Sequence, residues 1–224
     1  MAAISRTIIE TYYSKGDDLR MLDAGCGTGA GMTLLSEYGS VTGFDISYQA
    51  IRYSKKRNTG RLAMGSTMEI PFLDKTFDLV TSFDVLYFDQ VQDVIALQEF
   101  YRILVRGGRV IVRVPAFDWL RGVHDVKVST GHRYTLRELS RKMENSGLCP
   151  IFLTYANSIL FPMIVVKRLC ERWFPRQPES DIAVNVGLLG KFFEYCLFLE
   201  AHIIKIRPIP FGLSIFAVGE KQSS

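Results

Sequence analysis

Short runs of apolar and β-branched residues alternate along the chain with stretches that repeat apolar positions at helical spacing. The runs predict strands over 20–24, 41–44, 62–65, 77–83, 109–114, 150–155 and 213–219. Helices are expected over 4–14, 34–38, 48–57, 91–104 and 135–146. Ser47 and Thr135 are expected to cap the helices that follow them. Such alternation indicates parallel strands joined by crossover helices, and therefore an α/β fold with helices on both faces of the sheet.

The last crossover departs from this pattern. About 55 residues separate Tyr155 from Leu213, which is too many for a plain loop. Two apolar stretches at 159–169 and 188–204 predict a helical insertion over 157–210, within a single domain over 1–224.

The composition of this insertion leaves three interpretations open. The second stretch is apolar nearly all round, so it is buried or meets lipid or another protein. The first carries basic residues, among them Lys167, Arg168 and Arg172, beside Trp173 and Phe174, a composition suited to an anionic membrane surface. A lid over an acceptor site and a membrane contact are compatible with each other, whereas a homodimer interface is the third interpretation.

The overall composition limits the cellular location and the kinds of partner that we expect. The net charge of +4 is small and the basic residues are scattered, so nucleic acid is not an expected partner. The four cysteines lie far apart, which favours a reducing compartment and predicts no metal site. No apolar run reaches the roughly 20 residues that span a bilayer. We expect a cytoplasmic protein that is soluble or peripheral, with the inner face of the membrane as a site of contact.

A glycine-rich stretch, Leu-Asp-Ala-Gly-Cys-Gly-Thr-Gly-Ala-Gly over 22–31, follows the first predicted strand and opens a helix. Glycine allows the backbone to turn tightly there and to approach a bound nucleotide. The spacing Gly25-x-Gly27-x-x-Ala30, with Asp45 20 residues beyond Gly25, also satisfies the dinucleotide pattern. Spacing alone therefore does not separate a dinucleotide from another nucleotide-like cofactor.

Three further features favour another cofactor. Asp23 would repel a pyrophosphate but suits a ligand with an ammonium and a sulfonium. No tyrosine is followed by lysine four residues later, so the short-chain dehydrogenase pair is missing. Later segments resemble the motifs of class I S-adenosylmethionine (SAM)-dependent methyltransferases, of a type 11-like subgroup. These segments are 43–47, 65–72, 77–88 and 104–112.

The resemblance implies a Rossmann-like sheet of seven strands, the last one antiparallel between the fifth and sixth. It implies SAM as cofactor, with S-adenosylhomocysteine as product. Asp23, Gly25 and Gly27 would hold the methionine part, with Cys26, Thr28 and Gly29 completing the loop. Asp45 would bind the ribose, Ile46 would flank the adenine, Thr67 and Met68 would lie along it, and Phe83 and Asp84 would close the pocket. The family often has Asp where Ser66 stands and His where Tyr87 stands. The adenine contact would therefore pass to a hydroxyl or a backbone group at Ser66, and Tyr87 is a candidate substrate contact whose role the resemblance leaves open.

The segment after the fifth predicted strand is the candidate acceptor site, since chemistry gathers at the carboxyl ends of strands in such sheets. It holds Trp119, His124 and Asp125, followed by His132, Arg133 and Tyr134. His124 is the leading general base, oriented by Asp125. His132, Arg133, Tyr134 and Trp119 are further candidates for catalysis or substrate contact, although the residues at 132–134 precede a helix and could simply anchor it.

The pattern His-Asp…Gly-His-Arg-Tyr-Thr resembles methyltransferases linked to surface-glycan and lipid-linked sugar metabolism. The sequence therefore predicts methyl transfer from SAM to a hydrophobic or lipid-linked small molecule, with oxygen favoured because the His-Asp pair then has a proton to remove. Alternatives are a soluble quinone or natural-product methyltransferase, a non-catalytic SAM-binding partner subunit, and a NAD-dependent oxidoreductase.

Overall fold

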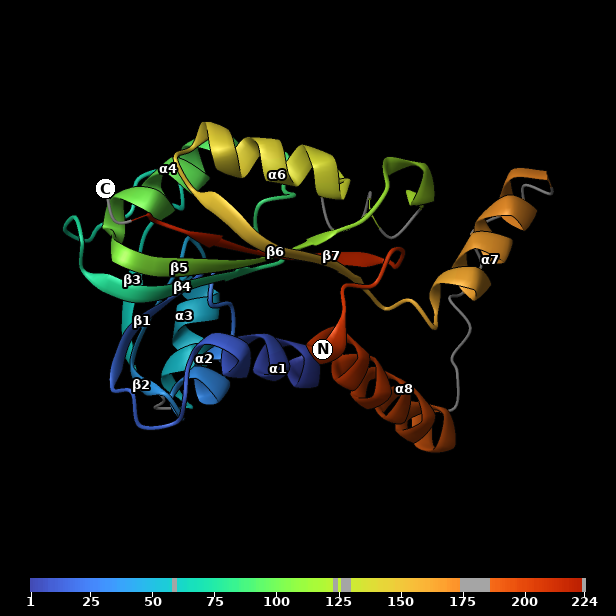
Figure 1. The fold of residues 1–224 in the computed structure, drawn as a ribbon, viewed down its shortest axis with the longest axis horizontal. Coiled ribbons are helices and arrows are strands. Elements are labelled where there is room, and N and C mark those ends of the chain that lie inside the picture. Colours follow the sequence, from blue (N-terminus) through green and yellow to red (C-terminus); the bar gives the residue numbers. More distant parts are fainter. Residues whose placement is uncertain (58–59, 123–124, 126–129, 174–185, 223–224) are drawn as a thin grey trace.

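Seven strands form one sheet in the order β3-β2-β1-β4-β5-β7-β6 (Figure 1). The computed structural model describes residues 1–57, 60–122, 125, 130–173 and 186–222, with the backbone alone for 171–173 and 186–194. The strands are β1 (Leu19–Ala24), β2 (Gly39–Asp45), β3 (Arg61–Met64), β4 (Phe77–Phe83), β5 (Leu104–Pro115), β6 (Cys149–Ala156) and β7 (Ser214–Glu220). β7 pairs antiparallel with both β5 and β6, as the family resemblance implied.

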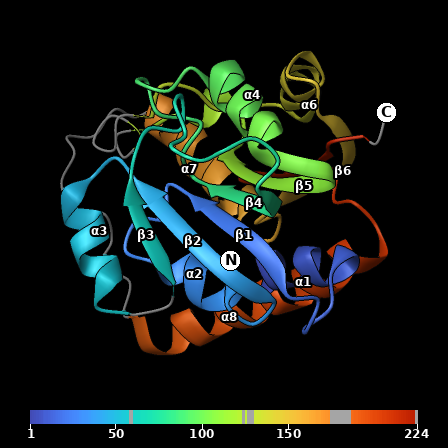
Figure 2. The ribbon, with the colours of Figure 1, turned by 90° about the vertical axis from the view of Figure 1, so that its left-hand side faces the viewer.

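Helices cover both faces of this sheet. They are α1 (Ala2–Tyr12), α2 (Ala30–Leu35), α3 (Tyr48–Lys55), α4 (Asp93–Ile103), α6 (Leu136–Asn145), α7 (Phe161–Trp173) and α8 (Val186–Ile206), with a short 3-10 helix, η1, at Asp118–Leu120. Figure 2 shows α4 and α6 on one side of the strands and α1, α2 and α8 on the other. The predicted α/β architecture is confirmed.

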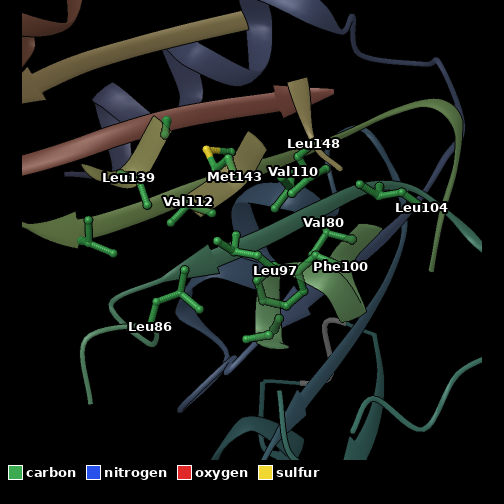
Figure 3. Packing of buried hydrophobic residues seen from close by; sticks show 14 of the residues in the cluster. Val80, Leu86, Leu97, Phe100, Leu104, Val110, Val112, Leu139, Met143 and Leu148 are labelled. Atoms are coloured by element: carbon green, nitrogen blue, oxygen red, sulfur yellow. The ribbon is translucent and has the colours of Figure 1, made fainter. Parts of the chain in front are cut away.

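The two faces bury separate apolar clusters. On the first face, Val80 and Val112 of the sheet meet Leu97 and Phe100 of α4 and Met143 of α6 (Figure 3). On the second face, strand residues pack against α1, α2 and α8. All strands between the edges are thus buried on both sides, which explains their nearly continuous apolar sequences.

Most element boundaries agree with the sequence to within two residues, and both predicted caps are present. Ser47 Oγ accepts a hydrogen bond from Ala50 N at 3.3 Å, and Thr135 Oγ1 accepts one from Glu138 N at 3.3 Å. Two elements differ by more. The helix expected over 34–38 spans Ala30–Leu35 instead, and Tyr38 lies in the core. β5 begins at Leu104, where the chain already pairs with Phe77.

The predicted insertion is helical and lies between β6 and β7. α8 packs on α1, with Ala201 and Ile204 buried in the same cluster as Ile4 and Ile8. α7 stands beyond the end of the sheet toward which β5 runs (Figure 1), and its Arg168 Nε donates to Leu120 O of η1 at 3.1 Å. Among the described helices, none combines the length and the apolar character that crossing a bilayer requires.

Candidate functional site

The glycine loop joins β1 to α2. Two of its glycines are required by close packing, and one faces open space. Gly25 and Gly29 have φ angles of +77° and +81°. A Cβ on Gly25 would lie 2.4 Å from Val85 Cγ2, and one on Gly29 would lie 2.3 Å from Ser54 Oγ. Gly27 also has a positive φ, +53°, but a Cβ there would meet no atom within 4 Å. The outer glycines are therefore required by packing, whereas the middle one faces open space.

Two adjoining cavities of about 340 Å³ and about 670 Å³ lie beside this loop at the carboxyl ends of the strands. Gly25, Gly27 and Phe83 line both cavities. Of the other predicted cofactor residues, the smaller cavity is lined by Asp23, Cys26 and Thr28, and the larger by Asp45, Ile46, Ser66, Thr67, Met68 and Asp84. The structure thus brings together every predicted cofactor residue except Gly29, whose place is in the packing of the loop.

Asp23 contributes a buried carboxylate to the smaller cavity. Its side chain ends β1, is only 3% exposed, and accepts a hydrogen bond from Thr81 Oγ1 at 3.0 Å. Burial raises the pKa of Asp23 to about 6, although Thr81 and the charge of Arg113 oppose the rise. A cationic ligand group would relieve this cost, because it stabilises the ionised carboxylate.

Asp45, at the end of β2, ties the glycine loop to the larger cavity. Its Oδ2 accepts a hydrogen bond from Gly27 N at 2.9 Å, and its Oδ1 accepts one from Ser47 N at 2.8 Å. A carboxylate keeps further lone pairs after these two bonds, so it can still accept from ligand hydroxyls. The neighbouring Ile46 is 72% exposed, which leaves an apolar side chain free to cover a planar ring.

The opposite wall of the larger cavity comes from the segment after β3. Ser66 Oγ accepts a hydrogen bond from Met68 N at 3.2 Å, so its hydroxyl hydrogen can still be donated to a ligand. Met68 Sδ in turn accepts from Gln92 N at 3.3 Å, which fixes the thioether against the start of α4. A hydroxyl therefore stands where the family often has a carboxylate.

Several lining residues were not foreseen from the sequence. Ala2 and Ser5 of α1 and Arg113 of β5 line the smaller cavity together with Asp23. No sequence motif includes these residues. α1 precedes the glycine loop, and a charged residue in a strand, such as Arg113, is expected to face solvent. The register of β5 beside β4, which pairs Arg113 with Phe83, is what brings this arginine to the cavity.

On the acceptor side, aromatic rings gather after β5. Phe117 stacks on Tyr155 with ring centroids 5.0 Å apart, and it lies 5.8 Å from Trp119 and 5.9 Å from Phe161 of α7. Phe211 lies 5.6 Å from Phe161. Trp119 is 47% exposed. We call these five residues the aromatic surface. It unites the loop after β5 with the insertion, and it includes the predicted substrate residue Trp119.

Tyr87, the other predicted substrate contact outside this loop, follows β4. Its ring centroid lies 4.6 Å from that of Phe88, which lines the larger cavity. Partial burial raises the pKa of the Tyr87 hydroxyl, as does the nearby charge of Asp84, so it stays protonated at neutral pH. The phenol is thus available as a hydrogen-bond donor near the cleft.

The polar residues of the loop after β5 serve mainly to hold it. Asp125 is 3% exposed and accepts from Arg133 Nε at 2.8 Å and from Gly122 N at 2.7 Å. Burial alone would raise the pKa of Asp125, but Gly122 and Arg133 outweigh burial and lower it. Arg133 also donates to Ala116 O at 3.2 Å. These contacts favour an anchoring role for both residues.

His132 and Tyr134 are likewise committed to the structure. The ring nitrogens of His132 lie 2.9 Å from Asp118 Oδ2 and 2.7 Å from Glu138 Oε1, so neither is free to take a substrate proton. Tyr134 is 1% exposed, and its hydroxyl donates within the core to Leu86 O at 2.9 Å. This burial favours a structural role for Tyr134 over the predicted contact with substrate. His124 lies outside the described residues, and its role as base stays a prediction.

Comparison with known proteins identifies a methyltransferase domain within the chain. Residues 22–112, from β1 through most of β5, match the family model of a methyltransferase domain. Residues 22–112 therefore carry a methyltransferase domain, and the chain shares its fold with a SAM-dependent methyltransferase of solved structure. The cavities fit this cofactor, since the open side of Gly27 lies between a carboxylate suited to an ammonium and one suited to ribose hydroxyls. When bound, SAM supplies an electrophilic methyl group on a sulfonium.

Two relatives by sequence accompany this match. An uncharacterized protein of Methanocaldococcus jannaschii is 28% identical to this chain over 189 residues. The match covers 80% of this chain and 79% of that protein. The demethylmenaquinone methyltransferase of Staphylococcus aureus strain MRSA252 is 36% identical over 102 residues. That match spans only 42% of each of the two proteins.

Solved structures agree on the fold of the methyltransferase. A putative methyltransferase of Haloferax volcanii, in complex with the Trm112 activator, has a TM-score of 0.64 at 16% identity, covering 99% of this chain and 90% of that one. Phosphoethanolamine N-methyltransferase 2 of Haemonchus contortus, in complex with SAM, has a TM-score of 0.65 at 18% identity, covering 98% of this chain and 52% of that one.

Proposed function

We propose that this methyltransferase transfers the methyl group of SAM to an oxygen atom of a hydrophobic small molecule whose apolar part is lipid-like or lipid-linked. The aromatic surface carries the proposal. It lies where the loop after β5 meets α7, and Trp119 leaves much of its ring open to a ligand. Aromatic side chains bury large apolar areas on contact, so such a surface favours an apolar ligand over a small polar one.

Methyl transfer from a sulfonium needs alignment more than covalent help from the protein. A hydroxyl acceptor must also lose a proton, which calls for a base within reach. We assign that role to His124, next to the anchored Asp125. Tyr87 would contribute a donor that orients the acceptor oxygen. A sugar hydroxyl of a lipid-linked glycan and the hydroxyl of another lipid-like molecule both meet this description.

The insertion supports a position at a membrane. Tyr195, Phe198, Leu199, Ile203 and Ile206 are exposed along one face of α8 at spacings of three and four residues. The other face of α8 packs on α1. Lys205 and Arg207 are exposed at the end of α8, and Lys167 is exposed on α7. An apolar helix face with flanking cations suits the inner, anionic face of a cytoplasmic membrane, and α7 would then cover the acceptor site as a lid.

Co-sedimentation with vesicles tests this membrane contact. The enzyme should bind vesicles that contain anionic lipid and should bind neutral vesicles more weakly. Phe198→Ser combined with Ile206→Ser should reduce binding to anionic vesicles. Unchanged sedimentation, together with a dimer-to-monomer change in the double variant, would instead assign the face to a homodimer.

The acceptor is tested by incubating the enzyme with SAM and a lipid extract and measuring S-adenosylhomocysteine. The methylated product should partition into the organic phase. With isotopically labelled methyl, mass spectrometry should place the label on an ether or ester oxygen. Label found only in water-soluble products would contradict the proposal.

A quinone is the second candidate acceptor, because the demethylmenaquinone methyltransferase of Staphylococcus aureus is 36% identical over its matched residues. An isoprenoid-tailed quinone would also suit the aromatic surface. The position of the label separates the two candidates, since a methyl group on ring carbon would favour the quinone and one on oxygen would favour our first proposal.

A further inference from the structure

The smaller cavity holds two side chains of opposite charge, Asp23 and Arg113. Asp23 was expected there from the glycine motif, whereas Arg113 belongs to no motif. Arg113 lies on β5 with its guanidinium over the ring of Phe83, 5.1 Å from the ring centroid, and 5.9 Å from that of Phe216. These rings hold the planar guanidinium in place at the cavity wall.

The hydrogen bonds of Arg113 leave part of its guanidinium unused. Nε donates to both carboxylate oxygens of Asp84 at 3.1 Å, and Nη2 also contacts Asp84 Oδ2. Within the described part of the chain, no residue accepts a hydrogen bond from Nη1. Arginine has five N–H donors, so it can keep Asp84 and still receive a second anion.

The methionine part of SAM ends in an ammonium and a carboxylate. Asp23 suits the ammonium, but a carboxylate in the same cavity needs a donor of positive charge, because both Asp23 and Asp45 repel it. Arg113 is the charged donor that lines this cavity with Asp23, and Ser5 adds a hydroxyl from α1.

We propose that Arg113 binds the methionine carboxylate of SAM while Asp23 binds the ammonium, so that the pair selects ligands that carry both charges. Arg113 at the same time retains Asp84, which lines the larger cavity and has a positive φ of 60°. Arg113 therefore positions Asp84 at the edge of the larger cavity, where the adenosine would bind, and connects the two cavities of the cofactor site. This inference concerns the cofactor alone and stands or falls independently of the acceptor.

Calorimetric titration with SAM and with decarboxylated SAM tests the proposal. Both ligands carry the sulfonium and the ammonium, and they differ only in the carboxylate. The wild-type protein should bind SAM about 10- to 100-fold more tightly, as expected for a charge-assisted hydrogen bond. In Arg113→Met this preference should fall to about threefold or less, because SAM loses more affinity than decarboxylated SAM does. Arg113→Lys should keep part of the preference.

Two further variants separate this role from a structural one. The double variant Asp84→Asn, Arg113→Met also removes the carboxylate that the single variant would leave unpaired. It should show the same small affinity ratio of SAM to decarboxylated SAM as Arg113→Met. Arg20→Met also removes an arginine from an ion pair with an aspartate, Asp78, but at the amino ends of the strands. The Arg20→Met variant should prefer SAM over decarboxylated SAM as strongly as the wild type does. Equal affinity of the wild type for both ligands, or a preference that survives in Arg113→Met, would overturn the proposal.

Discussion

Asp23 combines deep burial with a charge that the fold itself does little to stabilise. The free energy of unfolding reflects this, because the pKa of Asp23 rises from 3.8 to about 6 on folding. A raised carboxyl pKa contributes stability below pH 4, and this contribution is lost as the pH rises through about 6. The residue is therefore suited to ligand binding at the expense of the stability of the free protein.

Asp23→Asn should raise the free energy of unfolding of the ligand-free protein at pH 7 by about 1–3 kcal/mol, because it removes an unfavourable buried charge. It should also weaken SAM binding. In the wild type, SAM affinity should rise about tenfold between pH 5 and pH 7, since the ammonium pairs with the ionised carboxylate. Calorimetry at both pH values should find no such rise in Asp23→Asn. A wild-type affinity independent of pH would contradict this role.

Gly25 and Gly27 allow a matched comparison within one loop. Gly25→Ala forces a Cβ against Val85 at a positive φ and should lower the free energy of unfolding by about 2–4 kcal/mol. Gly27→Ala meets no atom and should cost only about 1 kcal/mol. Its methyl group points into the cleft, however, so SAM affinity should fall at least about tenfold. Denaturant unfolding and calorimetry measure both effects. A larger stability loss in Gly27→Ala would be inconsistent with the loop geometry.

At the scale of elements, the insertion is attached to the domain at two points. α8 packs on α1, and Arg168 of α7 donates to Leu120 of η1. The two helices are also joined through Glu200, which is buried on α8 and accepts a hydrogen bond from Ser158 N at 2.9 Å just before α7. Burial raises the pKa of Glu200, although Ser158 opposes the rise.

Glu200→Ala should lower the free energy of unfolding by about 1–2 kcal/mol, because it leaves the partly buried amide of Ser158 without its acceptor. Glu200→Gln keeps an oxygen at that position without the charge and should be at least as stable as the wild type at pH 8. Thermal unfolding of the three proteins measures this. Equal stability of the alanine variant and the wild type would show that Glu200 does not join the helices.

Sequence patterns predicted those elements that depend on local chemistry. The strand positions, the caps at Ser47 and Thr135 and the two insertion helices follow from composition over a few neighbouring residues. Tyr134 and Arg113 could not be placed in this way. Tyr134 lies in a polar stretch of the sequence, and it is buried through contacts with Leu86 and Asp93, which are distant along the chain. Arg113 reaches the cofactor cavity through the pairing of β5 with β4.

At the scale of the whole molecule, the glycine-loop cavities and the aromatic surface lie at different strands of the sheet. The glycine loop, Asp23 and Asp45 lie at the ends of β1 and β2, whereas the aromatic surface lies beyond β5. α1 links the smaller cavity to the insertion, since it lines that cavity with Ser5 and packs against α8 through Ile4 and Ile8.

The central claim is that the aromatic surface receives an apolar acceptor for methyl transfer. It is tested most directly by measuring S-adenosylhomocysteine formation with a series of alcohols of increasing chain length. For the wild type, kcat/KM should rise about fourfold with each added methylene, as expected from apolar burial of about 0.8 kcal/mol. Trp119→Ala should flatten this rise, while Tyr53→Ala, which removes an exposed aromatic from α3, should keep it. Equal dependence on chain length in all three proteins would contradict the account.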